Sequence, residues 1–291
     1  KSLGMSSKPN CRSKICLKSD GNLSFDPKNN ATIFMKFYSN LAGDLVRQLP
    51  TAPKKFGMDT VKKYYEKYKL EGKDFSFSPV TEETILKLLL NTNPSKAAGL
   101  DNLAGKFLRE GASVLVTPVT EICNLSIRLS AFPDKCKIAK LKPLFKKWSK
   151  TEAQNYRPIS LLPLISKIVE RVIYDQTQNF LHKNEILYKY QSVFHSNHST
   201  NSCLSYLSNK VLTSFDQGML TGMILIDLQK AFDTIDHKIL LQKMKYLGFS
   251  DTTIKWFESY LSNRIFKVNV ADEYSNPGDL SCGVPQGSIL G

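Results

Sequence analysis

The chain has 291 residues, enough for one large domain or two small ones, and 42% of them are apolar, so it can bury a core. This composition excludes a wholly disordered protein. The formal net charge is +14 and is unevenly distributed: residues 1–150 hold 27 Lys and Arg against 13 Asp and Glu, whereas residues 151–291 hold 13 of each. Such an excess in one half favours contact with a polyanion, most simply nucleic acid, although a basic protein without that partner would have the same composition.

The six cysteines are scattered, and the four histidines do not supply zinc-ligand spacing around them. This pattern favours the reduced thiols of an intracellular protein, cytoplasmic or nuclear, over a zinc site or a disulfide framework. No apolar run approaches the roughly 18 residues that a membrane-spanning helix needs. No charged-then-apolar leader opens the chain, so we expect neither membrane insertion nor secretion.

The first part of the chain is polar and basic. Residues 1–24 are rich in Lys, Ser and Asn, and we expect them to be irregular. After Pro27, apolar residues recur at helical spacing and predict a helix over about residues 33–41. Residues 50–79 contain Pro and Gly among Lys and Tyr, which is typical of a linker. A short helix is predicted within it, near residues 61–68. The tyrosines of that helix either stack on bases or pack against other side chains. Residues 1–75 are therefore predicted to be a basic linker or N-terminal extension, separate from residues 76–291.

The rest of the chain alternates helical patterns with a few strands. Thr81 is a candidate N-cap, with Glu82 and Glu83 in the first turn, where the helix dipole favours acids. Further helices are predicted at residues 115–129, 163–181, 202–218, 237–246 and 251–261. The apolar run at residues 223–228 predicts a buried strand, and the alternation at residues 264–270 predicts a second one. This mixture indicates an α+β fold.

A carboxylate, Asp227, stands near the end of the apolar run. A carboxylate at the end of a buried strand is costly unless it meets a cation or a metal. Because Mg²⁺ prefers carboxylate and carbonyl oxygens, Asp227 and the main-chain carbonyl of Leu228 are candidate metal ligands. A helix cap or a buried salt bridge explains Asp227 alone equally well. For Asp233 and Asp236, capping and solvation are the favoured interpretation.

Three other segments have the residue types of an anion or nucleotide site. Gly283, Pro285 and Gly287 predict a tight turn that a ligand can approach closely, with the two-sided amide of Gln286 inside it. Residues 135–150 hold seven lysines and no acid, which is typical of a phosphate-neutralising surface, although solvation alone explains most of these lysines. Arg157 precedes a proline, whose ring favours extended backbone before it, and could present a guanidinium fork to phosphate.

Two of these segments resemble central motifs of the reverse transcriptases of jockey-like non-LTR retrotransposons. They are Asp227-Leu-Gln-Lys-Ala-Phe-Asp233 and Gly283-Val-Pro-Gln-Gly-Ser288. The segment Asn155-Tyr-Arg-Pro-Ile-Ser-Leu-Leu162, with Lys167 after it, resembles a fingers motif of the same family. Residues 191–200 resemble a second fingers motif, in which Val193 replaces a glycine and His195 an arginine.

The resemblance implies a right-hand polymerase fold, with fingers and a partial palm in residues 76–291 and the thumb absent. It also implies RNA-directed DNA polymerase activity by two-metal nucleotidyl transfer, with Mg²⁺ or Mn²⁺, an RNA template, a DNA primer and deoxynucleoside triphosphates. In this interpretation Asp227 is catalytic and binds metal together with Leu228, and Phe232 is the steric gate that excludes ribonucleotides. The other residues implied to lie near the nucleotide are Arg157, Lys146, Gln286 and Gly287.

The same family has a second carboxylate pair, in an aromatic-x-Asp-Asp hairpin that follows the glycine-rich motif. No Asp-Asp pair occurs in this chain. We therefore expect a fragment that ends before this hairpin and is inactive by itself. The alternative is a non-catalytic, basic nucleic-acid-binding remnant of a mobile element. An unrelated Mg²⁺-dependent phosphotransferase would need a Gly-rich phosphate loop, which the sequence lacks.

Overall fold

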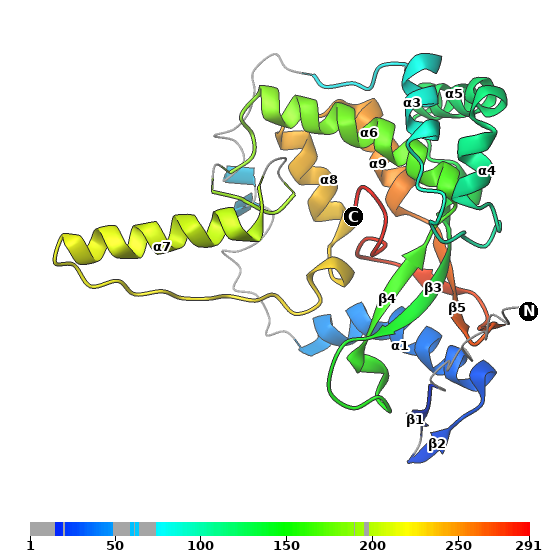
Figure 1. The fold of residues 1–291 in the computed structure, drawn as a ribbon, viewed down its shortest axis with the longest axis horizontal. Helices are drawn as coiled ribbons and strands as arrows, with labels where there is room; N and C mark the ends of the chain where they lie inside the picture. Colours follow the sequence, from blue (N-terminus) through cyan, green and yellow to red (C-terminus); the bar gives the residue numbers. More distant parts are fainter. Residues whose placement is uncertain are drawn as a thin grey trace, which may run out of the picture. The chain divides into compact units, whose positions relative to one another are not determined.

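The structure, a computed structural model, is mixed α/β (Figure 1). It describes residues 15–19, 21–48, 59–60, 62–63, 74–188, 190–194 and 198–291. The chain divides into two compact units, a larger one of residues 1–176 and 231–291 and a smaller one of residues 177–230. None of the helices in the described ranges has the length and apolar character needed to cross a membrane.

The larger unit is built around a five-stranded sheet with the strand order β4-β3-β5-β6, in which β7 also pairs with β5. Its strands are β3 (Ile138–Phe145), β4 (Tyr156–Leu161), β5 (Arg264–Val270), β6 (Glu273–Tyr274) and β7 (Gly278–Leu280). β3 and β4 form an antiparallel hairpin, whereas β3 and β5 run parallel, with Ile138 opposite Ile265. The strand predicted at residues 264–270 is confirmed, and it forms an antiparallel hairpin with β6.

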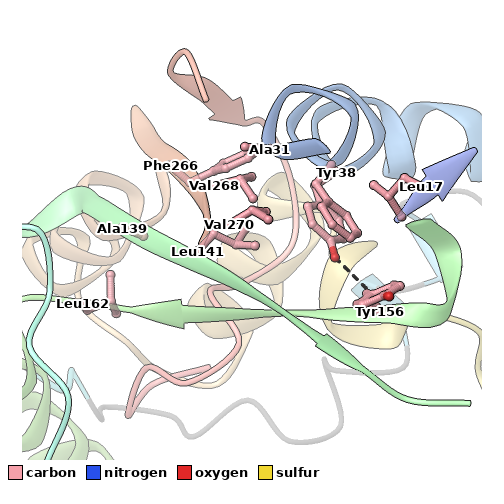
Figure 2. Close-up of a cluster of buried hydrophobic side chains, with 11 residues drawn as sticks. Leu17, Ala31, Tyr38, Ala139, Leu141, Tyr156, Leu162, Phe266, Val268 and Val270 are labelled. Carbon is pink, nitrogen blue, oxygen red and sulfur yellow. Dashed lines mark hydrogen bonds between the residues drawn. The ribbon is translucent and has the colours of Figure 1, made fainter. Parts of the chain in front are cut away.

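Helix α1 (Pro27–Gln48) packs its apolar face on this sheet and makes the main core (Figure 2). Phe34 meets the ring of Tyr156 edge to face, with 5.0 Å between the ring centroids. The hydroxyl of Tyr38 donates a hydrogen bond to the Tyr156 carbonyl at 3.5 Å. The helix predicted after Pro27 is therefore confirmed, and it ties the N-terminal part of the chain to strands β3, β4 and β5.

The remaining helices of the larger unit confirm most of the sequence-based boundaries. They are α3 (Glu82–Leu90), α4 (Gly105–Glu110), α5 (Ala112–Leu129), α6 (Leu164–Lys183, which continues into the smaller unit), α8 (His237–Tyr246) and α9 (Asp251–Leu261). Thr81 caps α3 as predicted, because its hydroxyl accepts from the Thr84 amide at 3.4 Å. Trp256 of α9 is fully buried, and it stacks on Tyr260 with 5.7 Å between the ring centroids.

The smaller unit contains helix α7 (Thr200–Asp216), which the predicted helix at residues 202–218 anticipated. A capping box between Ser199 and Ser202 starts it. The buried strand predicted at residues 223–228 is wrong. This segment has no regular secondary structure, it pairs with no strand in the described part of the chain, and Ile224, Leu225 and Ile226 are 85–89% exposed.

The N-terminal prediction was also partly wrong. Strands β1 (Leu17–Ser19) and β2 (Asn22–Ser24) form a short antiparallel hairpin, where irregular chain was expected. Gly21 lies in its turn with φ +84°, and Leu17 is fully buried in the core under α1. Residues 1–14, and most of the predicted short helix at residues 61–68, lie outside the described residues.

Candidate active site

The loop of residues 283–288 has a shape that only glycine permits at two positions. Gly283 and Gly287 have φ values of +74° and +108°. A Cβ atom on Gly283 would lie 2.6 Å from the Phe232 carbonyl oxygen, and one on Gly287 would lie 2.9 Å from the Ser160 carbonyl oxygen. The two glycines therefore let this loop touch the backbone of residues 232–233 on one side and of β4 on the other.

Main-chain hydrogen bonds hold these contacts in place. The amide of Gly283 donates to the Ile235 carbonyl at 2.9 Å, and the amide of Val284 donates to the Phe232 carbonyl at 2.8 Å. On the β4 side, the Ser160 amide donates to the Gln286 carbonyl at 2.8 Å. The end of the first motif, at Phe232 and Asp233, and the second motif, about fifty residues later, thus form one hydrogen-bonded structure.

Side chains reinforce the same junction. The Gln286 amide nitrogen donates to both oxygens of Asp233, at 2.9 and 3.0 Å. His237 Nε2 lies 2.7 Å from the Gly283 carbonyl, which can only accept, so this nitrogen carries the proton. Asp236 caps α8 by accepting from the Ile239 amide at 2.9 Å. The capping interpretation of Asp236 is confirmed, while Asp233 belongs to the junction itself.

Glu170 anchors the far end of the loop, and sequence analysis missed it. Its carboxylate is fully buried and accepts from the Ile289 amide at 2.8 Å, the Ser166 hydroxyl at 2.7 Å and the Tyr260 hydroxyl at 3.4 Å. Burial raises the pKa of Tyr260, and the negative charge of Glu170 adds to the effect. The available signal was an acid on the apolar face of the helical pattern at residues 163–181, four residues after Ser166.

Arg264 is a second buried charge that the sequence did not reveal. It is 3% exposed, its Nε donates to the Tyr260 carbonyl at 2.6 Å, and its guanidinium lies 4.2 Å from the centroid of the Tyr260 ring. Burial lowers its pKa, while the phenol of Tyr260 and the carboxylate of Glu170 oppose that shift. Nη1 and Nη2 have no hydrogen-bond partner among the described residues.

An open cavity lies between α1, the sheet and the 283–288 loop. Its polar lining includes Asp233, Gln286, Arg264 and Lys137. Lys137 is buried and pairs with Asp134 at 2.9 Å, so it is not one of the solvated lysines of its segment. The junction between the two motifs therefore borders an opening that polar ligand groups can enter.

The β3–β4 hairpin groups the predicted phosphate-binding residues on one side. Arg157 lies on β4 directly opposite Leu144 of β3, and its side chain is exposed. Strand alternation puts Lys142 on the same face, and Lys146, which follows β3, continues that alternation. The Lys146 amide donates to the Asn155 carbonyl at 2.9 Å, which extends the hairpin by one pair. Arg157 and Lys146 thus share one exposed, basic face.

Asp227 and Leu228 lie in the smaller unit, in the exposed irregular segment after α7. The main premise for a metal at Asp227, a carboxylate held at the end of a buried strand, does not hold in this structure. Within the described ranges, no group of three or more His, Cys, Asp or Glu side chains is arranged to hold a metal ion. Asp227 therefore offers a single carboxylate, which does not make a ligand set for the expected pair of ions.

The second fingers motif is described only in part. Val193 is 63% exposed, and the positive φ of this segment, +62°, falls on the next residue, Phe194. Val193, which replaces a glycine of the family motif, therefore does not itself have the left-handed backbone that favours glycine. His195 lies outside the described residues.

Comparison with known proteins agrees with the motifs. The family described as "Reverse transcriptase (RNA-dependent DNA polymerase)" matches residues 145–291. The chain is 33% identical over 214 residues to a probable RNA-directed DNA polymerase from transposon BS of Drosophila melanogaster, covering 73% of this chain and 24% of that protein. It is 31% identical over 215 residues to the RNA-directed DNA polymerase from mobile element jockey of the same species, and the match covers 74% of this chain and 23% of that protein.

A third relative, the RNA-directed DNA polymerase from mobile element jockey of Drosophila funebris, is 30% identical and covers 73% of this chain. The chain spans only about a quarter of the length of each of these relatives. The matched region includes both motifs of the junction and the β4 strand against which the loop packs. By this match over half of its length and by the shared motifs, the chain belongs to the reverse transcriptase family and is similar to its jockey-like members.

Proposed function

We propose that this chain is the nucleotide-selecting part of an RNA-directed DNA polymerase of a mobile element. It comprises the fingers and part of the palm of a right-hand polymerase, in residues 76–291, and acts inside the cell on an RNA template, a DNA primer and deoxynucleoside triphosphates. The observation that carries the proposal is the junction between residues 232–237 and 283–287. Family membership makes this junction the expected position of the incoming nucleotide.

Each predicted site residue has a role in this proposal. Phe232 is the steric gate, and its 41% exposed side chain leaves ring surface for a sugar to meet. Gln286 and Gly287 form the wall of the nucleotide site, and the bond from Gln286 to Asp233 fixes the orientation of the amide. Arg157 and Lys146 bind the triphosphate from the basic face of the hairpin, because a guanidinium fork and an ammonium suit phosphate oxygens.

Reverse transcriptases depend on divalent metals in general, which activate the attacking 3′ oxygen and neutralise the leaving pyrophosphate. We propose Asp227 and the Leu228 carbonyl as the contribution of this chain to binding Mg²⁺ or Mn²⁺. The chain contains no Asp-Asp pair, so we propose that it does not by itself supply the family's second pair of carboxylates. We therefore propose that the chain does not extend primers when assayed by itself.

A non-catalytic alternative has its own observation in its favour. The whole excess of positive charge lies in residues 1–150, where it suits sequence-independent nucleic-acid binding without chemistry. The two functions differ in one respect: only the polymerase requires Asp227. Binding alone depends on the lysines and would persist without this carboxylate.

The test is a chimera in which a related jockey-like polymerase supplies the segments that follow residue 291, including its Asp-Asp hairpin. We expect Mg²⁺-dependent primer extension from the chimera, and loss of extension with near-normal nucleic-acid binding from its Asp227→Asn variant. Phe232→Ala should lower discrimination against ribonucleotides by at least about tenfold, because the space that the ring fills becomes available to a 2′ hydroxyl.

Two outcomes would contradict the proposal. Extension by the 291-residue chain alone would show that no further ligands are needed. Full extension by the Asp227→Asn chimera would show that Asp227 is not the catalytic carboxylate. Asp216→Asn is the matched control, since Asp216 is an exposed acid at the end of α7 that lies outside both motifs.

A further inference from the structure

Trp148 is exposed in an unusual backbone conformation. Its side chain is 77% exposed, and its φ is +72°. A bulky residue at positive φ is a genuine outlier, and such strain is concentrated at ligand sites, where the surrounding structure maintains it. The other tryptophan of the chain, Trp256, is fully buried in the helical core.

The segment that presents Trp148 is held at several points. It connects β3 to β4 and comprises residues 146–155, which we call the connecting loop. The Asn155 side-chain amide donates to the Ser149 carbonyl at 2.9 Å, and the Tyr156 hydroxyl donates to the Lys150 carbonyl at 2.8 Å. From the N-terminal hairpin, the Lys18 amide donates to the Thr151 carbonyl at 2.8 Å. The indole is therefore mounted on a fixed loop, so little backbone entropy is lost when a ligand contacts it.

The charge around the indole is positive. Lys146, Lys147 and Lys150 are exposed in the same loop, and residues 135–150 contain no acid. The ammonium of Lys147 lies over the indole, 5.3 Å from the ring centroid. One face of the ring is thus covered by a cation, in a setting where phosphates would be attracted.

We infer that Trp148 is a stacking platform for an unpaired base of single-stranded nucleic acid, with the adjoining phosphates on Lys147 and Lys150 of the connecting loop. The inference rests on the proposed function and deepens it, because it names the form of nucleic acid that this edge of the hairpin holds. An exposed aromatic ring among lysines suits a single strand, whose bases offer free faces. The bases of a duplex are already stacked on one another.

The two tryptophans make a direct measurement possible in the unmodified chain. Trp148 is open to solvent and Trp256 is not, so emission that acrylamide quenches reports on Trp148. The probe for this titration is an oligouridylate of about 16 nucleotides. Stacking should quench the emission of Trp148 on titration and protect it from acrylamide, while a duplex of the same length should leave it unchanged.

Substitution then measures the contribution of the ring. Trp148→Gly removes the indole and also relieves the positive φ, so lost binding cannot be attributed to added backbone strain. We expect its affinity for the oligouridylate to fall by about 5- to 150-fold, with Trp148→Phe intermediate. Phe107→Ala is the matched control, because Phe107 is an exposed aromatic residue, 56% accessible, on helix α4 and not on the hairpin.

An abasic oligonucleotide of equal length separates the base from the phosphates. The Trp148→Gly variant should bind the abasic oligonucleotide with the same affinity as the unmodified chain, because this oligonucleotide has no base to stack on the indole. An equal loss on both oligonucleotides, or an unchanged affinity for the oligouridylate, would overturn the inference while leaving salt-dependent binding, and so the proposed function, intact. Failure of the unmodified chain to bind any of the probes would overturn both.

Discussion

At the scale of single residues, the junction depends on positions where one atom more would not fit. Gly283 has both a positive φ and a carbonyl oxygen within 2.6 Å of where a Cβ would lie, whereas Gly218 has a positive φ of +68° and nothing within 4 Å. Alanine substitutions at Gly283 and Gly218 therefore separate the free-energy cost of the positive φ from the cost of the steric clash.

Gly283→Ala should lower the free energy of unfolding by about 2–4 kcal/mol, since it adds overpacking to the left-handed backbone. Gly218→Ala should lower it by only about 1 kcal/mol, from conformation alone. Urea denaturation of the two variants and the unmodified chain gives the comparison. Equal costs at both sites would mean that the loop can move away from residues 232–233.

Glu170 permits a second test at this scale, because one carboxylate serves several donors. Glu170→Ala leaves the buried Tyr260 hydroxyl and the part-buried Ile289 amide without this acceptor, so we expect a loss of about 3 kcal/mol and faster hydrogen exchange at the Ile289 amide. Glu170→Gln retains one acceptor oxygen and should lose about 1 kcal/mol. The exposed Glu258 of α9 is the control, and Glu258→Ala should change stability by less than about 0.5 kcal/mol.

At the scale of elements, sequence patterns predicted the helices well because their signals are local. The side chains of Thr81 and Asp236 cap α3 and α8 through bonds to amides three residues away, which the sequence alone can suggest. The glycines of the 283–288 loop were likewise recognisable as a turn. Their partners were not, because Ser160, Glu170 and Asp233 reach the loop from distant parts of the chain.

Residues 223–228 show where a local pattern fails. An apolar run predicts burial, but burial of a strand also requires a partner strand, and the described residues provide none for this segment. The prediction for residues 17–24 was wrong in the opposite sense, because it expected irregular chain where a hairpin forms. The buried side chain of Leu17 and the glycine in the turn order this polar stretch.

The apolar run at residues 223–228 allows a test of whether it is buried, as its sequence pattern predicts, or exposed, as in the structure. Leu225→Lys should change the free energy of unfolding by less than about 0.5 kcal/mol and increase solubility, because it interrupts an exposed apolar, strand-forming segment. Val268→Ala, on the buried strand β5, is the contrasting variant and should cost about 2 kcal/mol. If Leu225→Lys destabilises the chain as much as Val268→Ala does, the segment is buried in solution.

The β3–β4 hairpin should dominate the salt dependence of nucleic-acid binding. Replacing Lys140, Lys142, Lys146 and Lys147 with Gln removes up to four phosphate contacts, and each contributes about 0.7 to the slope of log K against log salt for a single strand. We expect the slope to fall by up to about 3. The control replaces Lys87 and Lys106, which are exposed and paired with acids on their own helices. An equal change per lysine in the control would assign the effect to net charge rather than to the hairpin.

At the scale of the whole molecule, thiols and phenols that are buried in the neutral form make the free energy of unfolding decrease at alkaline pH. Burial raises the pKa of Cys123 to about 12 and that of Cys136 to about 11, from an ordinary value of 9.0, and it also raises the pKa values of Tyr38 and Tyr260. Because the folded pKa values exceed the unfolded ones, this stabilisation is complete below about pH 9 and is lost as pH rises above it.

The free energy of unfolding should therefore be flat from about pH 7.5 to 8.5 and decline from about pH 9 upward, as urea titrations at successive pH values would measure. Removing both buried thiols, as Cys123→Ala with Cys136→Ala, should reduce the decline between about pH 9 and 10. Cys203→Ala, at a partly exposed position of α7, is the control. A stability that rises with pH in this window would contradict the burial of these groups.

The parallel pairing of β3 with β5 has a consequence for the order in which the protein forms during synthesis. Ile138 pairs with Ile265, and helix α1 also packs on β5, so two early segments, α1 and β3, share a late partner. At about 5–20 residues per second, a ribosome needs roughly 6–25 s to proceed from one strand to the other. During that interval the basic β3–β4 hairpin has one edge of β3 still open, so its strand edge and its lysines are both accessible to the RNA that surrounds a nascent chain.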